Sequence, residues 1–227
     1  MLWRPCHEGR AARSPREMLM TEIVLTRHGH VPWLEPKRFR GRAELKLTDI
    51  GVAQAEATAG RISTGWRPRA IYASPLGRTL RTARIIAEPL RLPVQPMDAL
   101  IDIDYGEWQG LTVDEAKARW PAEVDLWHRR PDLVQLPGGE TLQEVLARVA
   151  GALRLIVGRH PQETVVLVGH DSVNRVILLH ALELPLARYG QLGQDPCAIN
   201  LIEASAEGFV VQTMNDTAHL PAGAREG

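Results

Sequence analysis

The chain has 227 residues and carries 27 basic and 27 acidic side chains, so it has no net charge at neutral pH. It lacks the overall positive field that would draw a protein to nucleic acid or to an anionic membrane, and any anion site must be local. Its two cysteines supply no disulfide framework, which favours a cytoplasmic location, and no apolar run reaches the roughly 20 residues of a membrane span.

The first segment of the chain, residues 1–20, has no pattern typical of a helix or a strand. It holds four arginines but no apolar stretch of the kind found in secretory signals. We predict that these residues form a disordered tail. Residues 21–220 are then expected to form one domain, since a chain of about 200 residues can bury a single large core.

The first predicted element is a strand over residues 22–28. Its apolar run is typical of a buried parallel strand, and it ends in Arg27-His28-Gly29-His30. In open α/β sheets the functional crevice lies beyond the carboxyl ends of such strands, so this histidine falls where chemistry is expected. An irregular loop to residue 47 follows, and then a helix from Thr48, a favourable N-cap, to about residue 61.

A second strand over residues 70–73 precedes a helix that is expected to begin at Ser74-Pro75. Serine would be the cap and proline would take the first helical position. Arg78 then falls in the first turn, where backbone N–H groups and the helix dipole favour an anion. This helix is predicted to end near Pro89, and residues 94–100 form a weaker strand candidate.

The stretch over residues 108–137 changes character and is predicted to form a small helical insertion over the active site. It holds three tryptophans, which we expect to form the core of the insertion: Trp108, Trp120 and Trp127. A capping box, Thr141-x-x-Glu144, then begins the clearest amphipathic helix of the chain.

A further strand ends in Gly169-His170-Asp171, which repeats the arrangement seen at the first strand. A helix over about residues 173–182 follows, and residues 197–205 and 208–214 are expected to close the domain as a hairpin. Strands that alternate with helices predict an α/β fold: a mostly parallel central sheet with helices on both faces and a small helical insertion over the active site.

Two histidines and two arginines at these positions would form a cationic pocket suited to a phosphoryl group. They are Arg27, His28, Arg78 and His170. Arginine supplies planar, bidentate donors to phosphate oxygens, and a neutral imidazole nitrogen can attack phosphorus to give a phosphohistidine intermediate. A carboxylic acid would protonate the departing alkoxide. The residues alone do not decide which acid this is, because Asp102, Asp104 and Glu107 are all candidates.

The chain resembles the histidine phosphatase superfamily, also called the phosphoglycerate mutase-like family, over residues 22–216. The matching segments are Arg27-His28-Gly29, Ser74 to Arg78, Gly106-Glu107-Trp108-Gln109-Gly110, Pro137 to Thr141, and Gly169-His170. The first of these alone is a weak signal. All of them, in the order and rough spacing of the family, make a strong one.

The resemblance implies that His28 is the nucleophile and that Arg27, Arg78 and a protonated His170 bind the phosphoryl group. The general acid of the family lies four residues before the first glycine of G-x-W-x-G, which is Asp102 here. Strand alternation would put Asp104 on the same face as Asp102, and Glu107 is a third option on composition. Phosphate charge should raise the pKa of the acid, so we expect an optimum on the acid side of neutral.

The predicted function is therefore hydrolysis of a small phosphomonoester, without a metal or another cofactor. Phosphoglycerate mutase-type transfer is the alternative, although Val31, Leu34 and Asp171 depart from the pattern of the mutases and favour a hydrolase. Less favoured alternatives are a metal-dependent hydrolase that uses His28, His30 and His170, and a phosphate-binding module without turnover. The sequence leaves the oligomeric state open, with a homodimer among the options.

Overall fold

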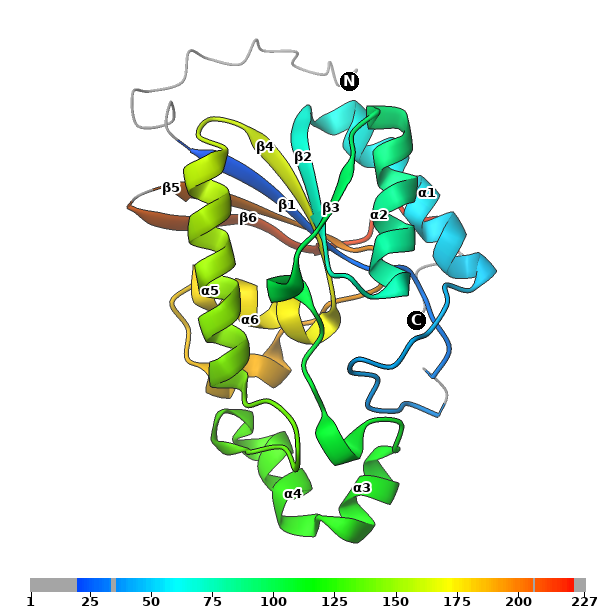
Figure 1. The fold of residues 1–227 in the computed structure, drawn as a ribbon, viewed down its shortest axis with the longest axis vertical. Helices are drawn as coiled ribbons and strands as arrows, with labels where there is room; N and C mark the ends of the chain where they lie inside the picture. Colours follow the sequence, from blue (N-terminus) through cyan, green and yellow to red (C-terminus); the bar gives the residue numbers. More distant parts are fainter. Residues whose placement is uncertain (1–19, 34–35, 206, 223–227) are drawn as a thin grey trace, which may run out of the picture.

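A computed structural model describes residues 20–33, 36–205 and 207–222. Leu34 lies outside the described residues, and so does the predicted tail except for Met20. A six-stranded mixed sheet runs through the centre of the molecule in the order β3-β2-β4-β1-β5-β6 (Figure 1). The strands are β1 Thr21–Arg27, β2 Pro68–Ala73, β3 Val94–Pro96, β4 Thr164–Gly169, β5 Ile199–Ser205 and β6 Gly208–Asp216.

The sheet is parallel on one side and antiparallel on the other. Strands β3, β2, β4 and β1 pair in parallel, whereas β5 pairs with β1 and with β6 in the antiparallel sense. The prediction of a mostly parallel central sheet is confirmed. The closing hairpin is also confirmed, with β6 two residues longer at its end than the sequence pattern indicated.

Helices cover both faces of the sheet. The helices are α1 Asp49–Gly65, α2 Gly77–Leu90, α3 Val113–Arg119, α4 Pro121–Arg129, α5 Leu142–Arg159 and α6 Asp171–Ala181, with short 3-10 turns η2 Asp98–Leu100, η3 Gly106–Trp108, η4 Pro131–Leu133 and η5 Leu186–Gln191. Figure 1 shows α1 and α2 on one side of the sheet and α5 and α6 on the other. Among the described residues, every helix is too short or too polar to span a lipid bilayer.

The apolar runs of the strands supply both halves of the core. Along β1, Ile23 and Leu25 pack with residues of α5 and α6, whereas Val24 between them packs with residues of α1 and α2. Strand β4 alternates in the same way, with Leu167 on the first face and Val168 on the second. Strands covered on both faces need apolar residues at every position, which explains the unbroken runs in the sequence.

Two predicted helix starts are confirmed and one is wrong. The Thr48 side chain accepts a hydrogen bond from the backbone at the start of α1, and the capping box of Thr141 and Glu144 begins α5. Helix α2, however, begins at Gly77 without a side-chain cap. The N-cap position is Leu76, two residues after Ser74, and the Ser74 hydroxyl lies 2.7 Å from Nε2 of His170.

Helices α3 and α4 and the turn η4 fall within the stretch that was predicted to be an insertion. They lie together at one end of the molecule, away from the loop that joins α5 to β4 (Figure 1). Trp108 is fully buried, and it joins Val124 and Leu136 in the same apolar cluster as α5 and α6. The stretch is therefore packed against the rest of the fold by a continuous core.

Candidate active site

Three neighbouring parallel strands end side by side and bring three polar side chains together. His28 follows β1, Ser74 follows β2 and His170 follows β4, which lies between the other two strands. The backbone N–H of His28 donates to the carbonyl of Gly169 at 3.1 Å, and that of Ser74 donates to the carbonyl of Val168 at 3.1 Å. The backbone hydrogen bonds of the sheet thus continue one residue beyond the strands and fix the positions of His28 and Ser74 relative to β4.

The His28 ring is buried, and its hydrogen bond determines which nitrogen is nucleophilic. Nδ1 lies 2.7 Å from the carbonyl oxygen of Gly29. A carbonyl can only accept, so Nδ1 carries the proton and Nε2 carries the lone pair. Burial, with the charges of Arg78 and Arg27, lowers the pKa of His28 well below its usual 6.5. The ring is therefore neutral near pH 7 and can act as a nucleophile.

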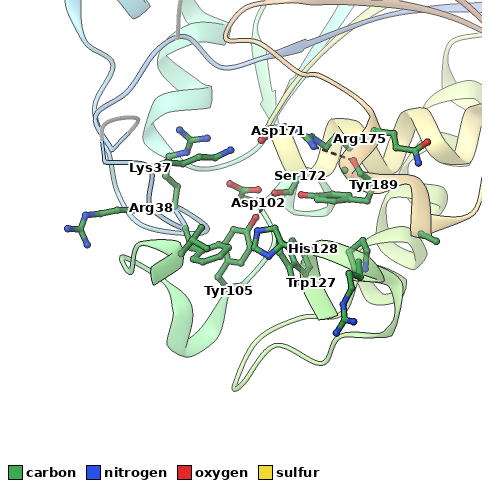
Figure 2. Close-up of a pocket in the computed structure, with 18 of the residues that line it drawn as sticks. Lys37, Arg38, Asp102, Tyr105, Trp127, His128, Asp171, Ser172, Arg175 and Tyr189 are labelled. Carbon is green, nitrogen blue, oxygen red and sulfur yellow. Dashed lines mark hydrogen bonds and ion pairs between the residues drawn. The ribbon is translucent and has the colours of Figure 1, made fainter. Parts of the chain in front are cut away.

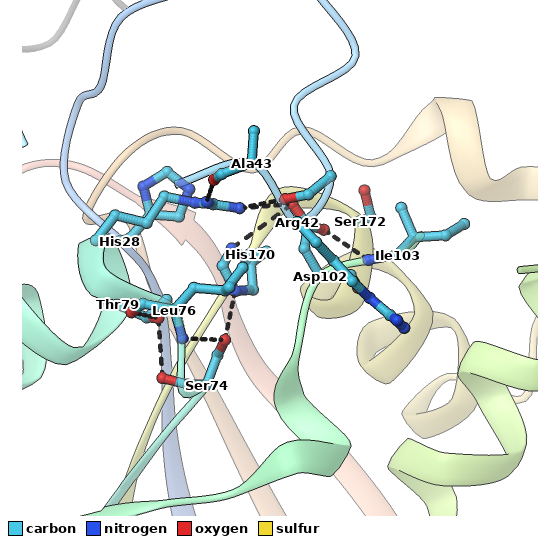
Figure 3. Close-up of polar contacts among 12 residues, drawn as sticks. His28, Arg42, Ala43, Ser74, Leu76, Thr79, Asp102, Ile103, His170 and Ser172 are labelled. Carbon is cyan, nitrogen blue, oxygen red and sulfur yellow. Dashed lines mark hydrogen bonds and ion pairs between the residues drawn. The ribbon is translucent and has the colours of Figure 1, made fainter. Parts of the chain in front are cut away.

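The second histidine, His170, lies beside the first, with the two ring centroids 5.3 Å apart (Figure 3). Its Nε2 is 2.7 Å from the Ser74 hydroxyl, and its Nδ1 is 3.6 Å from a carboxylate oxygen of Asp102. Burial, together with the charge of Arg78, lowers the pKa of His170 well below 6.5. Without substrate the His170 ring is therefore neutral near pH 7, because burial and the nearby guanidinium groups disfavour a positive charge. The expectation of a protonated His170 concerns the complex with a phosphoryl dianion and stays a prediction.

Two buried guanidinium groups face this pair of rings. Arg78 donates from Nη1 to the carbonyl of Ala43 at 2.8 Å and from Nη2 to the carbonyl of Gly41 at 2.6 Å. Arg27 donates from Nη1 to the carbonyl of Gln194. The Nε of each arginine is buried and has no hydrogen-bond partner within the described chain. Both N–H groups remain as donors for an anion.

Asp102 is the carboxylate that lies beside Arg78 and His170. Its Oδ2 lies 3.1 Å from Nη2 of Arg78, and its Oδ1 accepts a hydrogen bond of 3.0 Å from the backbone N–H of Ile103. Burial raises the pKa of Asp102 above 3.8, although Arg78 and then Arg40 oppose that shift. The carboxyl group therefore keeps its proton at a higher pH than an exposed aspartate does.

The other two acid candidates lie elsewhere. Asp104 forms an ion pair of 3.2 Å with Arg42 and accepts from the backbone N–H of Gly106, whereas Glu107 is exposed on η3. The expectation that Asp102 and Asp104 share a face is wrong, because the chain between η2 and η3 is irregular and strand alternation does not apply. Asp102 is the one of the three that lines the cavity described below.

His30 does not join the site. Its Nδ1 is 2.8 Å from the Thr48 hydroxyl at the start of α1. No group of three or more histidine, cysteine, aspartate or glutamate side chains that could hold a metal ion occurs within residues 20–33, 36–205 and 207–222. The arrangement of His28, His30 and His170 that a metal-dependent hydrolase would need is therefore not formed.

Comparison with known proteins places this geometry in a family. The model of the "Histidine phosphatase superfamily (branch 1)" matches residues 23–217. The chain belongs to this superfamily. Its chemistry is therefore phosphoryl hydrolysis or phosphoryl transfer through a histidine.

Relatives with different activities are similar to the chain. Phosphoserine phosphatase 1 of Hydrogenobacter thermophilus is 33% identical over 201 residues, which are 88% of this chain and 95% of that protein. A 2,3-bisphosphoglycerate-dependent phosphoglycerate mutase of Methylobacterium is 37% identical over 164 residues, 69% of this chain and 78% of that protein. The solved structure of Bacillus stearothermophilus YhfR superposes with a TM-score of 0.83 at 30% identity, covering 88% of this chain and 100% of that one.

Three of the superfamily segments in this chain have a structural role in addition to any chemical one. Gly29, in the R-H-G segment, approaches the start of α1 so closely that a Cβ there would clash with the carbonyl of Gly51. Gly106, in G-x-W-x-G, has a positive φ of 53° and no room for a Cβ beside the carbonyl of Pro137. The G-x-W-x-G segment thus contacts the segment from Pro137 to Thr141, and this contact supports the loop that carries Asp102.

A cavity of about 460 Å³ opens above His28 and Asp102. We call the residues at the strand ends the pocket floor: Arg27, His28, Ser74, Arg78, Asp102 and His170. We call the following residues of its lining the pocket mouth: Lys37, Arg38, Phe39, Tyr105, Trp127, His128, Arg129 and Tyr189. In Figure 2, Lys37 and Arg38 lie on one side, Asp171 and Arg175 on the other, and Asp102 lies between them.

Several residues of the cavity were not predicted from the sequence. Arg40 lines it and is buried, and Tyr105 and Tyr189 add aromatic surface. Asp171, noted in the sequence as a departure from the mutases, is an ion-pair partner of Arg175 at 2.6 Å. A signal for Arg40 did exist, because residues 37–42 hold four cationic side chains in six positions.

Proposed function

We propose that this protein hydrolyses small phosphomonoesters through a phosphohistidine intermediate on His28. One observation carries the proposal: a neutral imidazole with a free Nε2 lies in a buried floor beside a second imidazole and two guanidinium groups with unused N–H donors. A tetrahedral dianion is the ligand that such a set of donors fits.

Binding of the phosphoryl group satisfies the unused donors of the floor. The Nε–H groups of Arg27 and Arg78 donate to its oxygens. Nε2 of His170 is engaged with the Ser74 hydroxyl, whereas its buried Nδ1 has no hydrogen-bond partner among the described residues. With Ser74 as the donor, the ring proton is on Nδ1 and is a further donor for the phosphoryl group. These donors are fixed before the substrate arrives, and no reorganisation is needed when charge develops.

Nucleophilic attack follows. Nε2 of His28 forms a bond to phosphorus, the bond between phosphorus and the ester oxygen breaks, and the electron pair goes to that oxygen. Asp102 transfers its proton to the departing alcohol. The positive charge that develops on the phosphorylated ring is stabilised by the hydrogen bond from Nδ1 to the carbonyl of Gly29.

Water completes the reaction. The Asp102 carboxylate takes a proton from a water molecule as its oxygen attacks phosphorus. The bond between phosphorus and Nε2 breaks, its electron pair returns to His28, and inorganic phosphate leaves. Asp102 is then protonated and His28 is neutral, as at the start.

The protonation states that this cycle needs are opposite to those of free side chains. In water an aspartic acid, with a pKa of 3.8, is ionised well below the pH at which an imidazole of pKa 6.5 becomes neutral. Burial raises the pKa of Asp102 and lowers that of His28, so the acid and the free base coexist over a wider range. Activity should fall at high pH as Asp102 loses its proton and at low pH as His28 gains one.

Two observations favour hydrolysis over transfer. Val31, Leu34 and Asp171 depart from the mutase pattern. The similarity to phosphoserine phosphatase 1 extends over 95% of that protein. Candidate substrates are phosphorylated sugars, phosphoglycerates, phosphoserine and a nucleotide-derived ester such as α-ribazole phosphate. The mutase relative makes phosphoglycerate isomerisation the second candidate. A cytoplasmic location stays a prediction from the cysteine count.

The test is an assay of p-nitrophenyl phosphate, phosphoserine and 3-phosphoglycerate with EDTA and then with vanadate. We expect hydrolysis that ignores EDTA, is inhibited by vanadate and is lost in His28→Ala. Loss of activity with EDTA would point to a metal enzyme instead, and retention of activity in His28→Ala would refute the nucleophile. Isomerisation of 3-phosphoglycerate faster than phosphate release would favour the mutase.

A further inference from the structure

The segment from Pro137 to Thr141 is one of the superfamily segments, and the mechanism above does not use any of its side chains. Its acidic residue, Glu140, does not line the cavity, and its side chain is 20% exposed. The carboxylate nevertheless contacts three separate parts of the chain: the segment that carries Asp102, the loop before α1, and α5. Glu140 therefore connects the acid to elements that are far from it in the sequence.

Glu140 holds both backbone polar groups of Asp104, two positions after the acid. The N–H of Asp104 donates to Oε2 of Glu140 at 3.0 Å, and the carbonyl of Asp104 accepts from the backbone N–H of Glu140 at 2.9 Å. The chain between η2 and η3 is irregular, so no helix or strand satisfies these groups. The two bonds to Glu140 take the place of secondary structure there.

Arg148, on α5, orients the carboxylate of Glu140. Its Nε and Nη2 donate to the two carboxylate oxygens, at 3.1 Å each, in the parallel arrangement typical of a guanidinium and a carboxylate. Its Nη1 donates to the carbonyl of Ala99 at 2.7 Å, three positions before Asp102. Helix α5 is packed on the sheet by its apolar face. The segment that carries Asp102 is therefore held on both sides of the acid by a rigid element.

Arg42 completes this cluster from the loop before α1. Its Nη2 lies 3.1 Å from Oε2 of Glu140, and its Nη1 lies 3.2 Å from Oδ2 of Asp104. Its Nε lies 3.4 Å from the carbonyl of Asp102. The two arginines and the two carboxylates of the cluster balance in charge, and Oε2 of Glu140 already accepts from three donors. The cluster is therefore suited to holding the chain and not to binding a ligand.

The position of the Asp102 carboxyl depends on this backbone. The next residue, Ile103, is fully buried in the apolar cluster, and its N–H donates to Oδ1 of Asp102. Proton transfer to a leaving oxygen needs a heavy-atom distance of about 2.6–3.2 Å, and a shift of about 1 Å can cost on the order of 10²-fold in rate. A rotation of the peptide between Ile103 and Asp104 would thus be enough to remove the acid from the leaving group.

We propose that Glu140 is a positioning residue for the general acid: it fixes the backbone that carries Asp102, and Arg148 in turn orients Glu140. This inference rests on the proposed function, since it assumes that Asp102 protonates the leaving oxygen. Glu140 touches no reacting atom. Its loss therefore impairs proton transfer and leaves the donors of the pocket floor in place.

The test uses esters whose leaving groups need the proton to different degrees, with Glu140→Gln as the variant. p-Nitrophenolate leaves without a proton, phenolate needs it in part, and the alkoxide of glycerol 3-phosphate needs it fully. We expect kcat/KM to fall about tenfold to a hundredfold for glycerol 3-phosphate, less for phenyl phosphate, and under about threefold for p-nitrophenyl phosphate. Inhibition by inorganic phosphate should stay within about twofold, because a general acid does not bind it.

Two further variants separate positioning from a general loss of stability. Glu144→Ala removes a carboxylate four residues along, whose hydrogen bonds within the described residues cap α5 through Thr141. It should lower Tm and leave the ratios of kcat/KM among the three esters unchanged. Arg148→Lys keeps the positive charge but loses the paired bonds to Glu140, so it should give the same selective loss. It replaces Glu140→Gln if that variant does not fold.

Crystal structures of the wild type and of Glu140→Gln give a readout that needs no turnover. We expect the Asp102 carboxyl of the variant to lie about 1 Å or more from its wild-type position, without the contact to Nη2 of Arg78. The rings of His28 and His170 should superpose, because backbone hydrogen bonds of the sheet fix the chain at His28 and on both sides of β4.

The outcomes separate this inference from the proposed function. Equal losses on all three esters, no loss on any, or an Asp102 carboxyl that superposes on that of the wild type would overturn the proposal. A selective loss in Asp102→Asn that Glu140→Gln does not share overturns this inference alone. If the wild type hydrolyses none of the esters, the proposed function fails, and the two crystal structures still decide whether Glu140 positions Asp102.

Discussion

The pocket floor and the pocket mouth are built in different ways. The floor takes its rings and hydroxyl from residues that directly follow β1, β2 and β4, and backbone hydrogen bonds between those strands fix their positions. The mouth takes its side chains from the loop before α1, from the segment between η2 and η3, from α4 and from η5, which are far apart in the sequence. The sheet therefore determines the reaction, and the surrounding loops and helices determine which ester is admitted.

This contrast predicts that changes in the floor lower turnover of every ester. Changes in the mouth should alter the preference among esters. The variants below run from the largest expected effect to the smallest, with Asp102 and Ser74 in the floor and Glu107 outside the cavity.

Asp102→Asn removes the proton that the leaving alcohol needs. We expect kcat/KM for an alkyl phosphate to fall by about 10²–10⁴-fold, the usual contribution of a general acid. The fall should be smaller for p-nitrophenyl phosphate, because p-nitrophenolate leaves without a proton. The decline of activity at high pH should also disappear, since the raised pKa of Asp102 sets it.

Asp102→Glu is the matched control, because it keeps a carboxylic acid and should restore part of the activity on alkyl phosphates. Equal losses of Asp102→Asn on both classes of ester, with an unchanged pH profile, would show that Asp102 only holds Arg78 in place.

Ser74→Ala removes the partner of Nε2 of His170. The ring can then carry its proton on either nitrogen, so we expect kcat/KM to fall roughly fivefold for all esters, equivalent to about 1 kcal/mol for one hydrogen bond. A shift of the low-pH limb would accompany the loss if the tautomer of His170 changes. Ser74→Thr keeps the hydroxyl and should recover activity; a loss confined to one ester would contradict a role in the floor.

Glu107→Gln should have the smallest effect. The side chain is exposed on η3 and does not line the cavity, so we expect kcat/KM and the pH profile to stay within about twofold of the wild type. A large loss would show that the acid is not Asp102.

The sequence predicted the features that depend on local pattern. Apolar runs gave the strands that end at His28 and His170, and the capping box gave the start of α5. Asp102 followed from a motif spacing. It was separated from Asp104 only by the fold, because the irregular chain between them turns one carboxylate to the floor and the other to Arg42.

The features that depend on distant neighbours could not be predicted. The sequence pattern predicts that the Ser74 hydroxyl caps a helix. In the fold, β4 places Nε2 of His170 2.7 Å from that hydroxyl. The neutral state of His170 follows from burial and from guanidinium groups on other elements. Arg40 looks like one of several loop cations, and only its burial and the unpaired Nη1 distinguish it from Arg38 and Arg42.

The central claim is that His28 carries the phosphoryl group during turnover. It is tested most directly by mixing the enzyme with excess substrate, quenching in alkali, in which phosphohistidine is stable, and mapping the modified peptide by mass spectrometry. We predict a phosphoryl group on His28, absent from His28→Ala and accumulated in Asp102→Asn with p-nitrophenyl phosphate. An active enzyme that shows no phosphorylated residue under these conditions, or one that is phosphorylated at a residue other than His28, would contradict the account.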